Sequence, residues 1–289
     1  MKVLLTGAAG QLGTALRQSV AEGVDIVATD EQDLDICDPA GVASAISDER
    51  PELLINAAAY TQVDRAESDR EIAFEVNAAG PRLLAEALAA VGGRMIHVST
   101  DFVFAGDRPV PYAPDDPTSP LSVYGETKRA GEAAVLARLG VRAAVVRTSW
   151  LYSTTGRNFV RTMLTLMASR DSLGVVYDQV GSPTSAASLA RAIWAVAERA
   201  HVHGLQHWAD RGVASWYDFA VAIQEEAIVR GLLAKAIPIR AIRSADYPTP
   251  ARRPSFSVLD TRRTAAELGF DPPHWRQSLR NMLDELVKS

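Results

Sequence analysis

A tyrosine and a lysine four residues apart, Tyr124 and Lys128, stand where a proline-rich segment gives way to a stretch with helical spacing of its apolar residues. The segment 111–120 contains four prolines and cannot continue a helix, so a new helix is predicted to begin near the tyrosine. The two side chains would then lie one turn apart on the same face. A neighbouring ammonium would lower the pKa of the phenol from its ordinary value near ~10. The pair is therefore a candidate for general acid–base catalysis.

The apolar segment 94–100 upstream is predicted to be a strand, and it ends in Ser99 and Thr100. The carboxyl ends of parallel strands form the ligand-binding edge of an open α/β sheet. The Thr100 hydroxyl could donate a hydrogen bond to a ketone oxygen there. Two alternatives remain open: the tyrosine–lysine spacing also arises by chance on helix surfaces, and Thr100 could simply cap the turn after the strand.

Three glycines at three-residue intervals, Gly7, Gly10 and Gly13, lie between the first predicted strand and the first predicted helix. Glycine allows the backbone to approach a pyrophosphate closely, and the helix N-terminus offers free N–H groups. Asp30 ends the second predicted strand, where a carboxylate accepts hydrogen bonds from an adenine-ribose diol. The pattern predicts a dinucleotide site that favours NAD over NADP. The alternatives are a simple tight turn and an aspartate that only ends a strand.

Short apolar strands alternate with helical stretches from residue 2 to about residue 150. This alternation predicts an α/β fold of Rossmann type, with a doubly wound parallel sheet covered on both faces. The later part is less regular and is predicted to form a smaller α/β substrate domain. We therefore expect a dinucleotide-binding domain over 1–150, to which parts of 172–210 return, interleaved with a substrate-binding domain mainly over 151–289. In that second part, helices are predicted at 157–169, 188–200, 216–230 and 274–287, and a strand at 173–179.

The overall composition narrows the functional classes. The net charge is −5, which gives no broad attraction to nucleic acid or anionic lipid, so neither is an expected partner. The chain has neither a signal-peptide pattern nor a run of about 18 apolar residues, so it is expected to be cytoplasmic and not to span a membrane. Its single cysteine, Cys37, allows no internal disulfide and no cysteine-built metal site.

Several motifs together resemble the extended short-chain dehydrogenase/reductase family: TGAAGQLG at 6–13, NAAA at 56–59, the strand-end Ser–Thr, and the tyrosine–lysine pair. Within that family the resemblance is to the dTDP-4-dehydrorhamnose reductases, and it extends over almost the whole chain. The segments that carry it are GQLG, INAAAYTQVDRAE, VSTDFVFAG, SPLSVYGETKRAGE, RTSWLY and DQVGSPT.

The resemblance implies reduction of the C4 ketone of dTDP-4-dehydro-L-rhamnose to dTDP-L-rhamnose, with NADH or NADPH as cofactor. It implies that Tyr124 supplies the proton, that Lys128 adjusts its pKa and holds the nicotinamide ribose, and that Thr100 orients the carbonyl. The other implied cofactor contacts are Gly7, Gly10, Gln11, Leu12 and Gly13 at the pyrophosphate, Asp30 at the adenine ribose, Asp35 and Ile36 near adenine, and Ala59, Tyr60 and Thr61 along the nicotinamide side.

The implied substrate contacts are Thr100, Asp101, Trp150 and Arg253. Arg253 is preferred over Arg252 because a guanidinium matches the geometry of the substrate diphosphate. Trp150 could instead be an aromatic plug at the end of the fifth strand, and Arg253 an ordinary surface arginine. His97, inside an apolar strand, is expected to be a hydrogen-bonded core residue.

Two departures from related families limit the resemblance. The dehydratases of the superfamily have Asp–Glu after the strand-end Thr, whereas Asp101 is followed by Phe102, which argues against dehydration. Some reductases are joined by Mg²⁺ held between acidic residues, but Ala15 and Ala187 occupy the corresponding places. No metal is therefore expected, and the chain is predicted to be a monomer or weak homodimer. A sugar-nucleotide epimerase and a non-catalytic regulatory subunit like that of methionine adenosyltransferase remain the alternatives.

Overall fold

Six parallel strands form the central sheet in the computed structural model, which describes residues 1–288. The strand order is β10-β5-β4-β3-β1-β2, and every neighbouring pair is parallel. The predicted α/β fold with a doubly wound parallel sheet is confirmed. The strands are β1 (Lys2–Thr6), β2 (Asp25–Thr29), β3 (Leu53–Asn56), β4 (Arg94–Thr100), β5 (Ala143–Thr148) and β10 (Gly204–His207).

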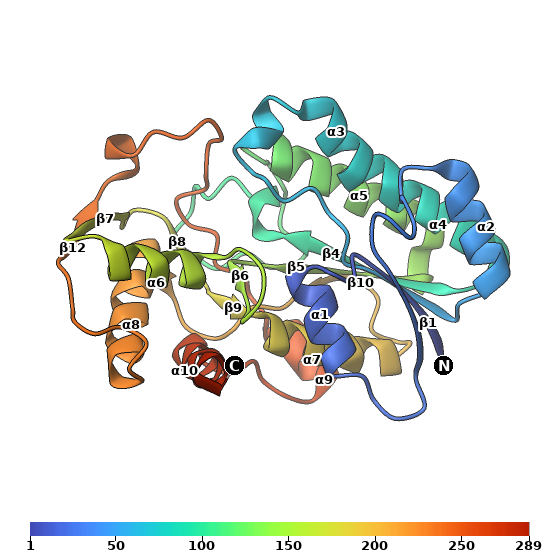
Figure 1. Ribbon diagram of the computed structural model, residues 1–289. Helices are drawn as coiled ribbons and strands as arrows, with labels where there is room; N and C mark the ends of the chain where they lie inside the picture. Colours follow the sequence, from blue (N-terminus) through green and yellow to red (C-terminus); the bar gives the residue numbers. More distant parts are fainter. Residues whose placement is uncertain (289) are drawn as a thin grey trace.

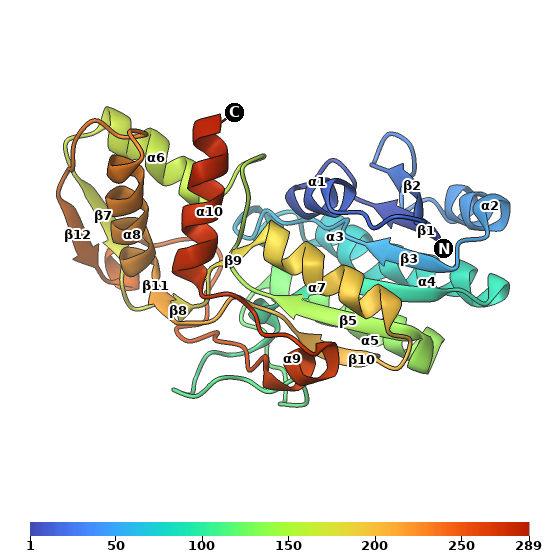
Figure 2. The ribbon, with the colours of Figure 1, turned by 90° about the horizontal axis from the view of Figure 1, so that it is seen from below.

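Alternate residues of each strand enter two different cores, because successive side chains of a strand point to opposite faces. Val3 and Leu5 pack on the face covered by α1 and α7, whereas Leu4 packs on the face covered by α2, α4 and α5 (Figures 1 and 2). The helices are α1 (Gln11–Gln18), α2 (Pro39–Glu49), α4 (Gly80–Val91), α5 (Val123–Leu139) and α7 (Ala186–Glu198). Burial on both sides explains why the strands are continuous apolar runs.

A third core belongs to the smaller α/β part, which lies beside the carboxyl end of the sheet (Figure 2). Tyr152, Phe219 and Trp275 are among its buried side chains. Its helices are α6 (Phe159–Ser169), α8 (Trp216–Val229) and α10 (Trp275–Lys288). Its strands are β6 (Leu151–Tyr152), β7 (Leu173–Val176), β8 (Val180–Gly181), β9 (Thr184–Ser185), β11 (Ala214–Ser215) and β12 (Ile239–Ile242), paired as β6–β9, β7–β12 and β8–β11.

Capping residues explain where several helices begin. Ser122, Asn158, Ser185 and Ser215 each accept a hydrogen bond from a backbone N–H of the first turn. For this reason α7 begins at Ala186, two residues before the predicted start, and α6 begins at Phe159, two residues after it. The predicted strand 173–179 ends earlier, at Val176, where its pairing with β12 stops.

A π-helical turn interrupts the helical segment that leads from Arg70 to Val91. The segment consists of α3 (Arg70–Phe74), the turn η2 (Glu75–Ala79) and α4. The turn buries Asn77, whose side chain bonds to both backbone groups of Tyr60. The remaining short elements are η1 (Arg65–Glu67), η3 (Asp101–Val103), η4 (Gly140–Arg142), η5 (Ser244–Asp246) and α9 (Arg262–Leu268).

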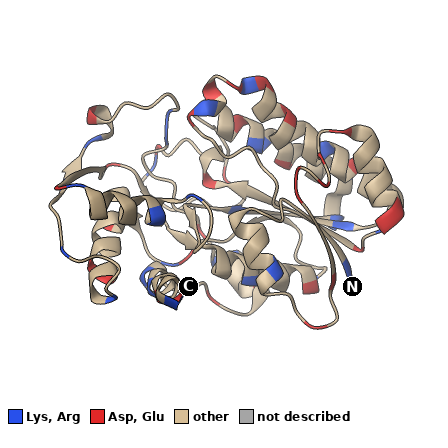
Figure 3. Cartoon of the chain, in the orientation of Figure 1, with Lys and Arg blue, Asp and Glu red and all other residues tan. Residues whose placement is uncertain are grey.

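Within residues 1–288, no helix combines the length and the apolar character needed to cross a bilayer. Acidic and basic residues are interspersed over the helices of both parts (Figure 3). The electrostatic environment at the carboxyl end of the sheet is therefore set by the hydrogen-bond and ion-pair partners of each charged group there.

Candidate active site

The strand order reverses between β1 and β3, and this is the point where open α/β sheets bind ligands. The loops after these two strands touch. Gly7, directly after β1, has φ of +72°, and a Cβ atom placed on it would lie 2.6 Å from the backbone nitrogen of Ala58. Any side chain at Gly7 would therefore push the two loops apart.

The glycine loop leaves the start of α1 open. A Cβ atom at Gly13 would lie 2.2 Å from the carbonyl oxygen of Gly7, so only glycine allows this approach of loop and helix. Gly10 is the N-cap of α1, and no side chain caps its free N–H groups. This arrangement fits the pyrophosphate of a dinucleotide.

The side chains of Gln11 and Leu12 both have contacts within the protein. The Leu12 side chain is buried in the core. The Gln11 side-chain oxygen accepts hydrogen bonds from Ser153 at 3.1 Å and Asn158 at 3.0 Å. Gln11 therefore ties the glycine loop to the smaller α/β part, a contact that the sequence did not predict.

The residues predicted around adenosine lie after β2. Asp30 follows the strand directly, and its side chain accepts a hydrogen bond from the backbone nitrogen of Gln32. Asp35 is exposed and accepts one from the backbone nitrogen of Cys37. Ile36 is buried in the core, where its side chain would contact any Cβ added to Gly80.

The loop predicted along the nicotinamide side, Ala59 to Thr61, follows β3. Asn77 fixes its backbone, donating to the Tyr60 carbonyl at 3.0 Å and accepting from the Tyr60 N–H at 2.8 Å. The Asn77 amide also donates to Thr127, on α5, at 3.0 Å. The π-helical turn thus links this loop to the helix that carries Tyr124 and Lys128.

Tyr124 and Lys128 both lie on α5, as the spacing predicted, but their electrostatics differ from the prediction. Burial raises the pKa of Tyr124 to about 12; the Thr100 hydroxyl beside the phenol opposes this shift, and the charge of Asp101 adds to it. Lys128 donates to the Val98 carbonyl at 2.8 Å, and burial lowers its pKa to about 8. The predicted lowering of the phenol pKa is therefore wrong in direction for this structure, because burial and the charge of Asp101 together outweigh the influence of Thr100.

Thr100, at the end of β4, is bound to the residue that follows it. Its hydroxyl donates to Asp101 Oδ1 at 3.0 Å and accepts from the Phe102 N–H at 3.2 Å. The other carboxylate oxygen, Oδ2, accepts a hydrogen bond from Ser257 at 2.5 Å. Burial raises the pKa of Asp101 to about 6, and the bonds from Ser257 and Thr100 oppose this shift.

Ser257 belongs to residues 249–260, here called the C-terminal strap. This segment also carries Arg253, whose guanidinium binds both oxygens of Asp64, at 2.9 and 2.7 Å. That contact lowers the pKa of Asp64. The arginine predicted to bind a diphosphate is thus held by a carboxylate in the loop before η1.

Trp150 follows β5 with a φ of +48°, one of two non-glycine residues with positive φ among residues 1–288. Its ring stacks on that of Trp216 at 3.5 Å, with 2° between the planes. Gly181 lies close to the ring, since a Cβ atom there would come within 2.6 Å of it. The packing expected for an aromatic plug is present, although Trp150 stays partly exposed.

A buried ion pair fixes α5 against β5. Glu132 accepts hydrogen bonds from Arg147 Nε at 2.8 Å and Nη2 at 2.7 Å, and from Ser99, at the end of β4, at 2.5 Å. Both charged side chains are buried. The ion pair between Glu132 and Arg147 was not predicted from the sequence. The spacing of Lys128 and Glu132 does place these two residues on one face of α5.

His97 lies on β4 and is fully buried. Its Nδ1 meets the Asn56 amide at 3.1 Å, and Nε2 has no hydrogen-bond partner among the described residues. Burial lowers its pKa well below the ordinary value. The expected core histidine is thus only half hydrogen-bonded.

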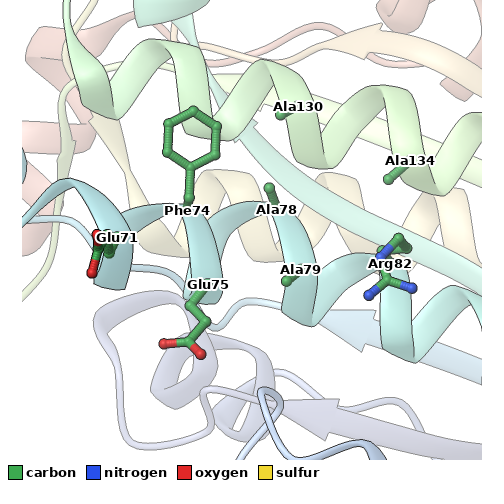
Figure 4. Close-up of a pocket in the computed structure, with 8 residues that line it drawn as sticks. All are labelled: Glu71, Phe74, Glu75, Ala78, Ala79, Arg82, Ala130 and Ala134. Carbon is green, nitrogen blue, oxygen red and sulfur yellow. The ribbon is translucent and has the colours of Figure 1, made fainter.

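A groove of about 630 Å³ lies elsewhere, between α5 and the α3–η2–α4 segment (Figure 4). Phe74 projects toward α5, and small side chains of both segments line the groove. It contains none of the predicted site residues. Among residues 1–288, no cluster of three or more metal-ligating side chains occurs.

Comparison with known proteins identifies the family. A family model described as the RmlD substrate binding domain matches residues 1–288. The dTDP-4-dehydrorhamnose reductase of Aggregatibacter actinomycetemcomitans is 40% identical over 288 residues, which cover 97% of this chain and 98% of that protein. The chain belongs to the dTDP-4-dehydrorhamnose reductase family. The resemblance found in the sequence motifs is confirmed.

Two further proteins are similar to this chain over nearly its full length. A Streptomyces antibioticus protein named as a probable dTDP-4,6-dihydroxy-2-methyloxan-3-one 4-ketoreductase is 43% identical and covers 99% of this chain and 96% of its own. The crystal structure of the Bacillus anthracis str. Ames dTDP-4-dehydrorhamnose reductase, in complex with NADP, has a TM-score of 0.93 at 35% identity, covering 98% of this chain and 99% of its own.

The buried Asp101 predicts a pH dependence of stability. Its folded-state pKa of about 6 exceeds the ordinary 3.8, so the folded protein binds more protons than the unfolded chain between these values. The free energy of unfolding should therefore fall by ~2 kcal/mol as the pH rises from 4 to 7. Asp101→Asn should lack this contribution. Denaturant unfolding of both proteins at the two pH values measures the difference, and a difference that does not change with pH would contradict the assignment.

Proposed function

We propose that the protein reduces the C4 ketone of dTDP-4-dehydro-L-rhamnose to dTDP-L-rhamnose with NADH or NADPH. The observation that carries the proposal is the arrangement at the sheet edge. The side chains of Thr100 and Tyr124 interact at the carboxyl end of β4, and the glycine loop follows β1 at the same edge of the sheet, in a chain of the dTDP-4-dehydrorhamnose reductase family.

The cofactor would be held by backbone N–H groups of the glycine loop, with Gly7, Gly10 and Gly13 allowing close approach. Asp30 would accept the adenine-ribose hydroxyls, which favours NADH because a carboxylate repels a 2′-phosphate. The B. anthracis relative was crystallised with NADP, so both cofactors belong in the test. Asp35, Ile36, Ala59, Tyr60 and Thr61 complete the proposed contacts. When bound, the reduced nicotinamide supplies the hydride.

Tyr124 would donate the proton to the alkoxide that develops at C4. Its raised pKa keeps the phenol protonated at neutral pH, as a proton donor must be, and an alkoxide is more basic than a phenolate. Lys128, one turn further along α5, would stabilise the phenolate that remains. Because the phenolate appears only as the reaction proceeds, this interaction favours the transition state over the ground state.

Thr100 and Asp101 would contact the sugar, and Trp150, which is partly exposed, would border it. Arg253 would bind the diphosphate, for which a planar guanidinium is well suited. In that case the substrate must compete with Asp64 for the two donors that the arginine now uses. We propose that this exchange couples substrate binding to the position of the C-terminal strap.

A related dTDP-sugar 4-ketoreductase activity is the second candidate. The S. antibioticus relative, which has such a name, is as similar to this chain as the rhamnose enzymes are. Both names describe reduction of a keto group on a dTDP-linked sugar, so the residues argued above would serve either reaction.

The decisive assay follows cofactor absorbance with dTDP-4-dehydro-L-rhamnose and a small panel of other dTDP-4-keto sugars. We expect oxidation of NADH or NADPH and formation of dTDP-L-rhamnose, identified by NMR. Preference for another keto sugar would favour the second candidate. If neither NADH nor NADPH is oxidised with any of these keto sugars, the proposal is contradicted. A sugar-nucleotide epimerase or a regulatory subunit would then be favoured.

Replacing Tyr124 by Phe should lower kcat at least ~10²-fold, the scale of losing a general acid. The dissociation constant for NADH, measured by fluorescence titration, should change little. Tyr177→Phe, at an exposed tyrosine of the smaller part, is the control and should leave both values unchanged. Turnover of Tyr124→Phe within a few-fold of the unaltered protein would show that another group donates the proton.

A further inference from the structure

We propose that Ser257 is a positioning residue for the reduction: it holds Asp101 so that the Thr100 hydroxyl can be released to the substrate ketone. The inference rests on the proposed function and adds a residue from the C-terminal strap to that site. Ser257 would not contact the substrate itself: it acts on Asp101, which in turn is bonded to Thr100.

The two oxygens of the Asp101 carboxylate have separate hydroxyl partners. Ser257 Oγ donates to Oδ2 and Thr100 Oγ1 donates to Oδ1. The three residues are 1–6% exposed, so water contributes little to their solvation. Among residues 1–288, Asp101 has no ion pair, and these two hydroxyls are its side-chain hydrogen-bond donors, beside the backbone N–H groups of Asp101 and Phe102. The titratable group that faces it is the phenol of Tyr124, from α5.

The position of Ser257 is fixed by backbone contacts on both sides. Its N–H donates to the Val180 carbonyl at 2.8 Å, and the Val180 N–H donates to the Ser255 carbonyl at 2.9 Å. On the other side the Tyr112 N–H donates to the Val258 carbonyl at 2.8 Å. The hydroxyl is therefore supplied by a strap whose backbone is anchored to two separate parts of the chain.

The role of Ser257 follows from the single proton that the Thr100 hydroxyl can donate. A threonine hydroxyl has one proton, and in this structure Thr100 gives it to Asp101. To bind a ketone oxygen, Thr100 must turn that proton away from the carboxylate. With Ser257 in place, the carboxylate keeps one side-chain hydrogen bond when this happens. Without Ser257, a buried carboxylate would have to give up its last side-chain hydrogen bond, so it would retain Thr100 or take up a proton.

The test measures kcat and KM for 4-keto sugar reduction between pH 5 and 9 in Ser257→Ala, Ser257→Thr and Ser255→Ala. Ser255 is a matched control on the same strap, since its hydroxyl donates to the Gly106 carbonyl at 2.7 Å. Loss of one hydrogen bond to a charged group should lower kcat about 10-fold in Ser257→Ala. The inflection in the plot of kcat against pH that is due to Asp101 should move about one pH unit higher. KM should stay within about threefold. Ser257→Thr should restore both values, and Ser255→Ala should resemble the unaltered protein.

A fall in kcat that is equal at every pH, with the inflection unmoved, would overturn the proposal and leave Ser257 a structural residue. Full kcat in Ser257→Ala would overturn it too. Should the alanine variant not fold, Ser257→Cys decides, because a thiol of similar size is a weaker donor and should shift the same inflection. Turnover by the unaltered protein tests the proposed function separately. If that turnover fails, a ¹³C-carboxyl NMR titration of Asp101 in the same variants still tests the role of Ser257.

Discussion

Removal of polar groups from water at the carboxyl end of β4 is the constraint on which the rest of the site depends. A buried charge or hydroxyl is tolerated only where a hydrogen bond or an opposite charge replaces its hydration. Asp101 has two hydroxyls, Lys128 has the Val98 carbonyl, and Glu132 has Arg147 and Ser99. These partners hold α5 and the C-terminal strap against β4, and the predicted catalytic hydroxyls are placed as a result.

The sequence was sufficient for the fold and for the elements that carry the candidate site. Burial on both faces makes the central strands continuous apolar runs, and short polar segments separate them from the helices. The limits of β4 were predicted to the residue, and Tyr124 and Lys128 lie on one helix as their spacing indicates. The family could be recognised from motifs because each loop at the carboxyl end of the sheet is a short continuous segment of the sequence.

The contacts between distant segments could not be read from local patterns. Ser257 lies 156 residues from Asp101, and Arg253 lies 189 residues from Asp64. The sequence shows no spacing that would pair them. The direction of the Tyr124 pKa was missed for a related reason: a charge four residues away is visible in the sequence, whereas the extent of desolvation depends on the complete packing. Burial and Asp101 together outweigh the opposing influences on this phenol.

The central claim is that packing keeps Tyr124 as a protonated phenol, ready to donate. Protein labelled with ¹³C at the tyrosine Cζ atoms provides the direct measurement, with the Tyr124 signal assigned from the spectrum of Tyr124→Phe. The account predicts that this signal keeps its phenol position from pH 6 to about pH 10. A signal that changes to the phenolate position below about pH 8 would contradict the account.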